Sequence, residues 1–137
     1  MALNARSQAA LANAHPLLKS LFAHVQKDYP NLKFQILESR RGEKDQEKAF
    51  AAGNSKAHFG QSPHNYSPAV ALDITPLPLD WNDIKAFKAL SVPILATAKK
   101  LGIPISWGGS WRTFKDYPHY ELTPWRDYAA KSKLFGR

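Results

Sequence analysis

The sequence predicts an α+β domain in which helices pack against a small, mostly antiparallel sheet. Segments with apolar residues at helical spacing alternate with short segments of strand character, in the order helix, strand, helix, strand, helix, strand, strand. The 137 residues, 44% of them hydrophobic, are enough to build one core. No repeat or long linker divides them. We therefore expect a single domain over residues 1–137.

The first half of the chain supplies two predicted helices and one strand. Apolar residues recur one helical turn apart in residues 15–26, and Tyr29 with Pro30 should end that helix. The stretch LKFQILES, residues 32–39, alternates apolar and polar residues as a half-buried strand does. The polar segment 42–53 is typical of a short helix that a glycine closes.

The next segments are a polar loop at residues 54–68 and a buried strand in AVALDIT, residues 69–75. A long helix should follow from a cap at Asp80 or Asn82.

That helix should stop at Gly102. Pro93 should kink it or split it in two, because proline lacks an N–H and clashes with the preceding turn. Two short strands are expected in residues 103–109 and 118–122.

Composition excludes several classes of protein. Without cysteine there are no disulfides or thiolate zinc sites, so any transition metal must be held by His, Asp or Glu. No apolar run approaches the roughly 20 residues of a membrane span, and the N-terminus lacks the apolar core of a signal peptide. We therefore expect a soluble protein made in the cytoplasm. The formal charge of +8 implies attraction to polyanions, but no nucleic-acid motif appears, so nucleic acid is not the expected partner.

Polar residues lie at the expected strand borders: His64 before the buried strand, Asp73 at its end, and Asp116 with His119 near the last strand. A buried, unpaired carboxylate costs several kcal/mol, so Asp73 needs a cation, hydrogen bonds or solvent. Two histidines and one carboxylate form the three-ligand set that leaves a fourth position on zinc for water. On an extended approach to the strand, Asp116 would point at the open side of His119, where a general base is needed.

The residues alone leave other interpretations open. Asp73 could cap a turn after its strand. Asp116 could form a surface ion pair with Lys115 or Arg112. His64 could be an ordinary loop histidine. The helical zinc-protease motif HExxH is absent.

Three longer stretches resemble a known family. SPHNYSPAVALDI, residues 62–74, and ISWGGSWRTFKDYPHYEL, residues 105–122, resemble the SxH…D and WGGDW…DxPHxE motifs of the zinc D,D-carboxypeptidase and L-alanyl-D-glutamate endopeptidase family, especially phage endolysins. SRRGEKDQEKAF, residues 39–50, is similar to the upstream arginine segment of that family, in which Gln follows Arg by five residues. The resemblance extends over most of the chain and implies the Hedgehog/DD-peptidase fold.

The sequence departs from the family pattern in two places. The gap between His64 and Asp73 is wider by two residues than in the commonest members, as in the subset with a proline in the motif, here Pro68. Ser110 stands where the family usually has Asp.

The resemblance implies a role for each matched residue. His64, Asp73 and His119 would be the zinc ligands, with Asp116 as the catalytic acid/base. Arg41 would hold the scissile carbonyl or the developing oxyanion. Arg40 is the alternative to Arg41, and Glu121 is the alternative base or a support for His119. The candidates for substrate contact are Ser62, Tyr66 and Trp107. The candidates for core and groove wall are Trp81, Trp107 and Trp111.

The implied function is a zinc peptidase that cleaves the peptidoglycan stem, as a phage endolysin acting on the L-Ala–D-Glu bond. The alternatives are a D,D-carboxypeptidase of the same family and a non-catalytic basic module bound to envelope polymer or nucleic acid. We expect a monomer that waits in the host cytoplasm until a membrane pore admits it to the periplasm and cell wall.

Overall fold

A four-stranded antiparallel sheet forms the middle of the molecule, which confirms the predicted α+β class. The computed structural model describes residues 3–136. The strands are β1 (Phe34–Glu38), β2 (Tyr66–Ser67), β3 (Ala71–Pro76), β4 (Ile105–Trp107), β5 (His119–Leu122) and β6 (Lys133–Leu134). The main sheet has the order β1-β3-β5-β4, and β2 pairs with β6 in a small second sheet.

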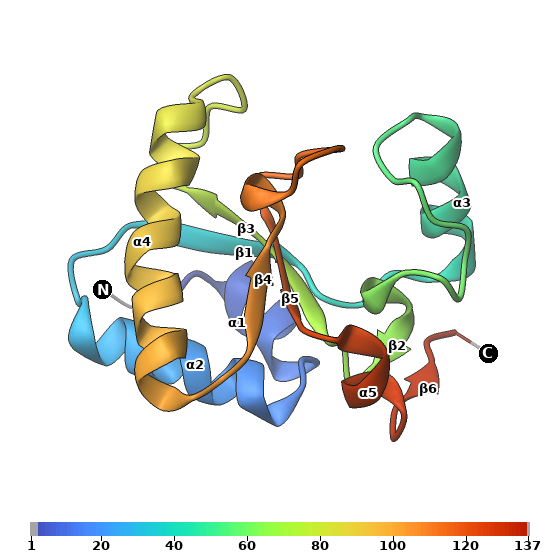
Figure 1. Cartoon of the computed structure of the whole chain (residues 1–137), viewed down its shortest axis with the longest axis horizontal. Coiled ribbons are helices and arrows are strands. Elements are labelled where there is room, and N and C mark those ends of the chain that lie inside the picture. The colour runs from blue at the N-terminus through green and yellow to red at the C-terminus, as the bar shows by residue number, and fades with distance from the viewer. Residues whose placement is uncertain (1–2, 137) are drawn as a thin grey trace.

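The helices lie on both sides of this sheet (Figure 1). They are α1 (Ala5–Ala12), α2 (Pro16–Asp28), α3 (Glu43–Ala51), α4 (Ile84–Leu101) and α5 (Trp125–Ala129), with 3-10 turns η1 (Pro63–Asn65) and η2 (Gly108–Ser110). In Figure 1, α2 and α4 lie together on the left, and α3 with its following loop stands apart on the right.

One face of the sheet is apolar and forms the core. Leu72 and Ile74 of β3 lie beside Tyr120 and Leu122 of β5, and each is at most 1% exposed. Burying side chains of this size is the main favourable term in folding. The helices α2 and α4 complete the core with Leu18, Leu21, Phe22, Val25, Leu90, Ile94 and Ala98.

The opposite face of β3 and β5 is polar, and we call it the site face, defined by Asp73, His119 and Glu121. Asp73 pairs with His119 across the ladder, and Ala71 pairs with Glu121. Asp73 lies within β3 and not at its end as predicted, because the strand continues to Pro76 in register with β1. An apolar strand can carry this charge because successive side chains point to opposite faces.

Helix α1, which the sequence analysis did not predict, covers the edge of the sheet at β1. The Ser7 hydroxyl accepts a hydrogen bond from the Ile36 N–H at 2.8 Å and donates one to Asn4 Oδ1 at 2.6 Å. Arg6 Nε donates to the Leu37 carbonyl at 3.1 Å. These bonds satisfy backbone groups that an edge strand otherwise leaves unpaired.

The long helix α4 corrects two expectations. Its N-cap is Asp83, whose side chain accepts from the Ala86 N–H, whereas Asp80 holds the preceding turn through the Asn82 N–H. Pro93 lies inside one continuous helix and does not split it. The carbonyl that loses its partner belongs to Ala89, an exposed residue, so water can satisfy it.

The short elements α5 and β6 were also not predicted. Both lie near the C-terminus, where β6 pairs with β2 through only two residues. Segments this short carry no readable hydrophobic period, so tertiary contacts decide their conformation.

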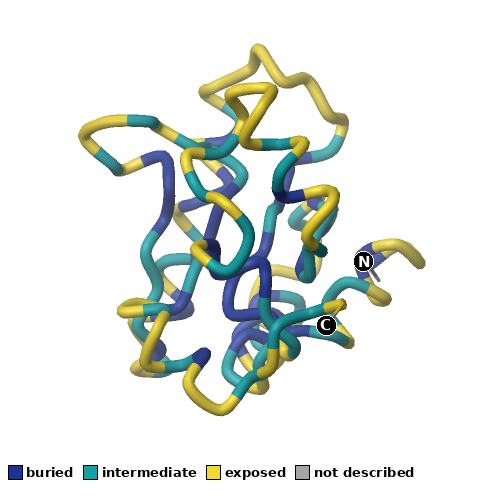
Figure 2. The backbone as a smooth tube through the Cα atoms, turned by 90° about the vertical axis from the view of Figure 1, so that its right-hand side faces the viewer, coloured by how far each residue is buried: buried dark blue, intermediate teal, exposed yellow. Residues whose placement is uncertain are grey.

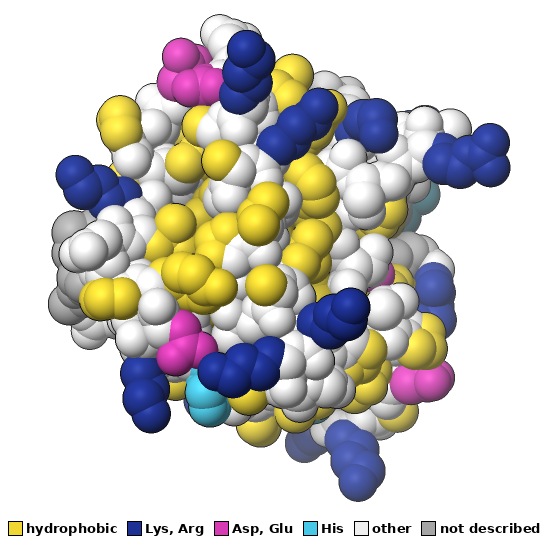
Figure 3. Space-filling model, turned by 60° about the vertical axis from the view of Figure 1, so that its left-hand side comes forward, with side chains coloured by type: hydrophobic (Ala, Val, Ile, Leu, Met, Phe, Trp, Pro, Cys, Tyr) yellow, Lys and Arg dark blue, Asp and Glu magenta, His cyan; other side chains and the backbone are white. Residues whose placement is uncertain are grey.

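The surface is polar in the loops and carries some exposed hydrophobic residues. Figure 2 shows the buried residues along the inner strands and helix sides and the exposed ones in the connecting loops. Hydrophobic side chains gather in the middle of the face in Figure 3, with Lys and Arg around them. The large hydrophobic residues exposed on α4 are Ile84 and Val92. Among the helices of residues 3–136, none has both the length and the apolar character needed to cross a bilayer.

We predict that Ser7→Ala lowers the free energy of unfolding by about 1–3 kcal/mol, because it leaves the buried Ile36 N–H without its acceptor. Ser20→Ala is the matched control, a helical serine that is exposed, and should change stability by less than about 0.5 kcal/mol. Urea unfolding of both variants measures the difference. Equal stability of the two would show that α1 does not protect this edge.

Candidate metal centre

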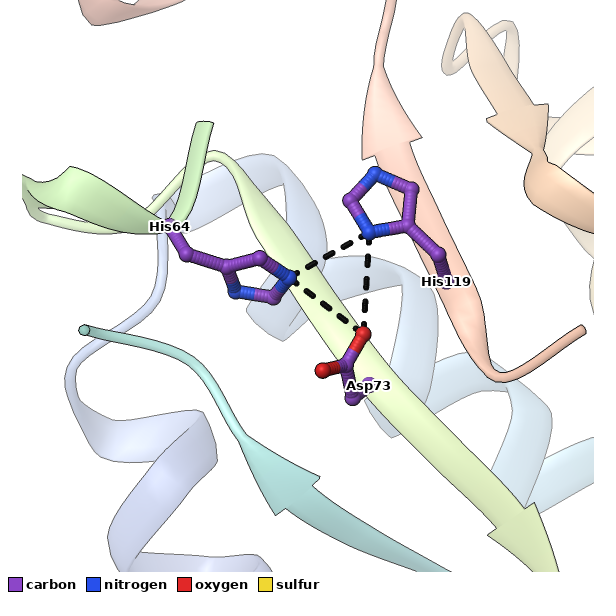
Figure 4. Close-up of side chains that lie close together, drawn as sticks. All are labelled: His64, Asp73 and His119. Atoms are coloured by element: carbon purple, nitrogen blue, oxygen red, sulfur yellow. Dashed lines mark hydrogen bonds and ion pairs between the residues drawn. The ribbon is translucent and has the colours of Figure 1, made fainter. Parts of the chain in front are cut away.

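Three side chains from separate segments converge above the site face (Figure 4). His64 comes from η1, Asp73 from β3 and His119 from β5. His64 Nε2 lies 3.2 Å from His119 Nδ1 and 3.3 Å from Asp73 Oδ1. His119 Nδ1 lies 3.6 Å from Asp73 Oδ1. The structure therefore brings together all three ligands that the sequence predicted.

These distances fit a bound metal ion. Ligands about 2.0–2.1 Å from a tetrahedral zinc ion lie about 3.3 Å from one another. The buried Asp73 Oδ1 accepts no hydrogen bond of good geometry from residues 3–136, although both imidazoles are near it. A buried oxygen with no donor needs a cation or a proton to offset its lost hydration. The donor set of two imidazoles and a carboxylate is one that zinc accepts.

Each imidazole is oriented by a hydrogen bond from the ring nitrogen that faces away from the common centre. His64 Nδ1 donates to the Ser39 carbonyl at 2.9 Å, since a carbonyl can only accept. His119 Nε2 donates to Glu121 Oε1 at 2.7 Å. In the neutral rings, His64 Nε2 and His119 Nδ1 therefore keep their lone pairs and point them at the common centre.

The charges at this centre shift two pKa values in opposite directions. Burial would raise the pKa of Asp73, but the charge of His64 and the contacts with both imidazoles hold it well below its ordinary value. Burial would lower the pKa of His119, but Asp73 and Glu121 raise it to about 9. With no metal bound, His119 therefore carries a proton at neutral pH, and the positive imidazolium offsets the charge of the Asp73 carboxylate. A metal ion must displace that proton, so metal affinity should rise with pH.

Asp116 reaches the site through a tight turn. The His119 N–H donates to the Asp116 carbonyl at 3.1 Å, so the two residues are joined by a turn and not by the extended approach we expected. This turn places Asp116 Oδ2 4.0 Å from His119 Nδ1. Burial and the negative charge of Asp73 raise the pKa of Asp116, the direction that suits a group that must both take and give a proton.

The two glycines of the WGG motif, Gly108 and Gly109, allow the turn at Asp116 to lie close to η2. A side chain at Gly108 would collide with the Asp116 carbonyl and lie 3.0 Å from Asp116 Cβ, and one at Gly109 would collide with the Trp107 ring. The Asp116 N–H donates to the Gly108 carbonyl at 3.0 Å. Ser110 donates its hydroxyl to the Trp107 carbonyl at 2.8 Å, which holds η2.

Arg41 lies beside the three candidate ligands, whereas Arg40 points away from them. Arg41 forms a two-pronged contact with Glu38 at 2.9 and 3.0 Å, and its Nη2 lies 3.4 Å from Asp73 Oδ2. Its Nη1 donates to Gln46 Oε1 at 3.1 Å, which explains the spacing of five residues. Among residues 3–136 these bonds use four of its five N–H groups and leave one on Nη1. Arg40 instead lies 4.3 Å over the Phe135 ring.

The buried side chain of Gln46 holds the loop after α3 in place. Besides accepting from Arg41, it donates to Ser55 Oγ at 3.0 Å and to the Ala57 carbonyl at 2.6 Å. It also accepts from Asn65 Nδ2 at 3.1 Å. One amide thus ties α3, its loop and η1 to the arginine.

A cavity of about 690 Å³ opens in front of the candidate metal centre. The loop after α3 forms one wall and residues 111–119 form the other, with Trp81 and Trp111 among the lining residues as predicted.

Of the three predicted substrate contacts, Ser62, Tyr66 and Trp107, only Ser62 lines the cavity. Ser62 lines the cavity but caps η1 by accepting from the His64 N–H at 3.2 Å. Trp107 is 8% exposed and stacks on Tyr120 in the core, outside the cavity lining. Tyr66 also lies outside the lining and donates its hydroxyl to the Gly60 carbonyl. Trp107 and Tyr66 are therefore structural in this fold.

Glu38 and Ser39 were not among the residues predicted from the sequence. Simple alternation would put Glu38 on the core face with Phe34 and Ile36, so a charge there was a signal that the alternation breaks. The register of β1 does shift between Ile36 and Glu38, which brings Glu38 opposite Asp73. Ser39 acts through its carbonyl, which no side-chain pattern can reveal.

The chain is similar to known proteins in sequence and in structure. Residues 1–124 match the family described as phage L-alanyl-D-glutamate peptidase. The chain is 30% identical over 102 residues to the peptidoglycan L-alanyl-D-glutamate endopeptidase CwlK of Bacillus subtilis (strain 168), a match that covers 65% of this chain and 60% of CwlK. The crystal structure of the L-Ala D-Glu endopeptidase ChiX of Serratia marcescens has a TM-score of 0.77 and 29% identity, and the match covers 93% of this chain and 94% of ChiX.

Proposed function

Because the chain belongs to the phage L-alanyl-D-glutamate peptidase family, we propose that it hydrolyses the bond between L-Ala and D-Glu in the stem peptide of peptidoglycan. The observation that carries this proposal is the set of three ligand atoms that face one point at the base of a cavity. An extended peptide can enter such a cavity from solvent. The names of CwlK and ChiX support the same bond.

Zinc is the metal that we propose for His64, Asp73 and His119. When bound, zinc lowers the pKa of water and polarises a carbonyl group. Hydrogen bonds from the imidazoles to Ser39 and Glu121 keep both rings in the tautomer that binding requires.

The neighbouring side chains supply proton transfer and charge. The Asp116 carboxylate takes a proton from the attacking water and passes it to the leaving amine of D-Glu. The remaining N–H of Arg41 is available to the carbonyl oxygen as negative charge develops on it. Glu121 is the weaker candidate for the base, because its carboxylate is held by His119.

We further propose that the chain acts as a phage endolysin. In this role it stays in the host cytoplasm until a membrane pore gives it access to the periplasm and cell wall. Its formal charge of +8 favours contact with anionic envelope polymers.

Digestion of purified peptidoglycan tests the bond and the metal together. We predict peptides that begin with D-Glu, detected by mass spectrometry, no activity after chelation, and recovery with about one zinc ion per chain. Zinc should also raise Tm, because it binds the folded state. Released terminal D-Ala would indicate a D,D-carboxypeptidase, and no product would indicate a non-catalytic module.

Two histidine variants provide the control for this experiment. His64→Ala should lose zinc and activity together. His24→Ala should keep both, because His24 is a half-buried residue of α2 outside the cavity lining whose ring contacts the Ser20 carbonyl. Full activity of the metal-free protein would rule out the zinc mechanism.

Asp116→Asn should retain zinc while turnover falls by about 100-fold or more, the usual contribution of a positioned acid/base. The amide preserves the shape of the side chain but cannot accept the proton. Metal content and kcat on the same preparation separate the two effects. If Asp116→Asn stays active and Glu121→Gln does not, Glu121 is the base.

Arg41→Ala should remove roughly 2–4 kcal/mol of transition-state stabilisation, by analogy with the loss of one oxyanion donor. The loss should appear mainly in kcat, because the guanidinium interacts more strongly with the oxyanion than with the neutral carbonyl. Arg41→Lys should recover only part of it, since lysine cannot form the two-pronged contact with Glu38. Arg40→Ala is the control, and a slower Arg40 variant would reverse the assignment.

A further inference from the structure

A lysine and an aromatic ring face each other across the cavity. Lys56, in the loop after α3, places Nζ 5.2 Å from the centroid of the Phe114 ring in the opposite wall. Phe114 has a φ of 48°, a left-handed conformation that is uncommon for a bulky residue. Strained residues of this kind cluster at sites that bind ligands.

The charge of Lys56 is available, whereas the other cations of the lining are engaged. Arg41 is paired with Glu38 and Asp73. Lys115 donates to the carbonyls of Trp111 at 2.7 Å and Gly109 at 3.4 Å. Lys56 forms no ion pair or hydrogen bond with any of residues 3–136, and its ring contact is weak at an exposed position.

The substrate in the proposed function carries an anion near the scissile bond. Glutamate has two carboxyl groups, and the stem peptide can continue through only one of them. The other remains as a carboxylate or an amide within a few bonds of the amine released by hydrolysis. The cavity lining includes Asp73, Asp116 and Glu121, which would repel a free carboxylate, so a cation on the wall away from them would favour its binding.

We propose that Lys56 binds this second carboxylate of D-Glu and so selects the residue on the leaving side of the cut bond. The inference rests on the proposed function and adds a specificity-determining residue to it. In the absence of substrate, the ammonium group lies beside the Phe114 ring in the cavity lining. A carboxylate then replaces the ring, since a charge-assisted hydrogen bond is stronger than an exposed contact with a ring.

The test is a competition between two soluble muropeptides in a one-to-one mixture. They differ only at the second carboxyl group of D-Glu, which is free in one and amidated in the other. The ratio of the two products equals the ratio of the kcat/KM values and does not depend on the amount of folded enzyme. The wild type should prefer the carboxylate by about tenfold, which corresponds to about 1.4 kcal/mol.

Three variants sharpen the experiment. Lys56→Met should bring the product ratio close to one, mainly through a higher KM for the carboxylate substrate, and Lys56→Arg should keep the preference. Lys48→Met removes the same charge from an exposed position on α3 outside the cavity lining and should behave as the wild type.

The outcomes separate this inference from the function on which it rests. If both muropeptides are cleaved and the wild type gives a product ratio near one, the proposed role of Lys56 is wrong. The same holds if Lys56→Met leaves the product ratio unchanged. In both cases the proposed peptidase activity is unaffected. If neither muropeptide is cleaved at the L-Ala–D-Glu bond, the proposed function fails and this inference fails with it.

Discussion

The Asp73 carboxylate lies within an apolar strand, and its need for compensation shapes the surrounding structure. Burial of an unpaired charge is too costly to be tolerated, so charged and polar groups from three other segments surround it. Arg41 lies on one side and the imidazoles of His64 and His119 on the other. The same arrangement leaves one oxygen without a good donor. A site that is electrostatically incomplete in the protein alone is ready for a cation.

The support around this carboxylate is built from backbone groups as much as from side chains. The carbonyl of Ser39 fixes one imidazole, and the turn from Asp116 to His119 fixes the position of a second carboxylate. The Asp116 carbonyl lies so close to Gly108 that only a residue without a side chain fits there. Such contacts leave little room for these side chains to move. Preorganised groups lose less free energy in reorganisation when charge develops on a substrate.

The sequence predicted those parts of the fold and site that depend on side-chain type and spacing. Apolar periodicity placed α2, β1 and β3, and the family motifs brought out His64, Asp73 and His119, the same three that the structure brings together. The family assignment is confirmed by the match over residues 1–124. What was missed depends on tertiary contacts. Helix α1 is short and is held by the hydrogen bonds of Ser7 and Arg6 with β1, which no hydrophobic period reveals. Trp107, which was expected both as a substrate contact and as a core or groove residue, lies in the core.

Because α1 covers the edge of β1, it limits how copies of the chain can associate through this strand. An open edge strand is a template to which the strand of another molecule can add, and this is a common start of aggregation. Ser7 and Arg6 occupy the outward backbone groups of Ile36 and Leu37, so a second chain finds no partners there. In this sense the first described helix removes a template for strand addition, although it lies away from the candidate metal centre.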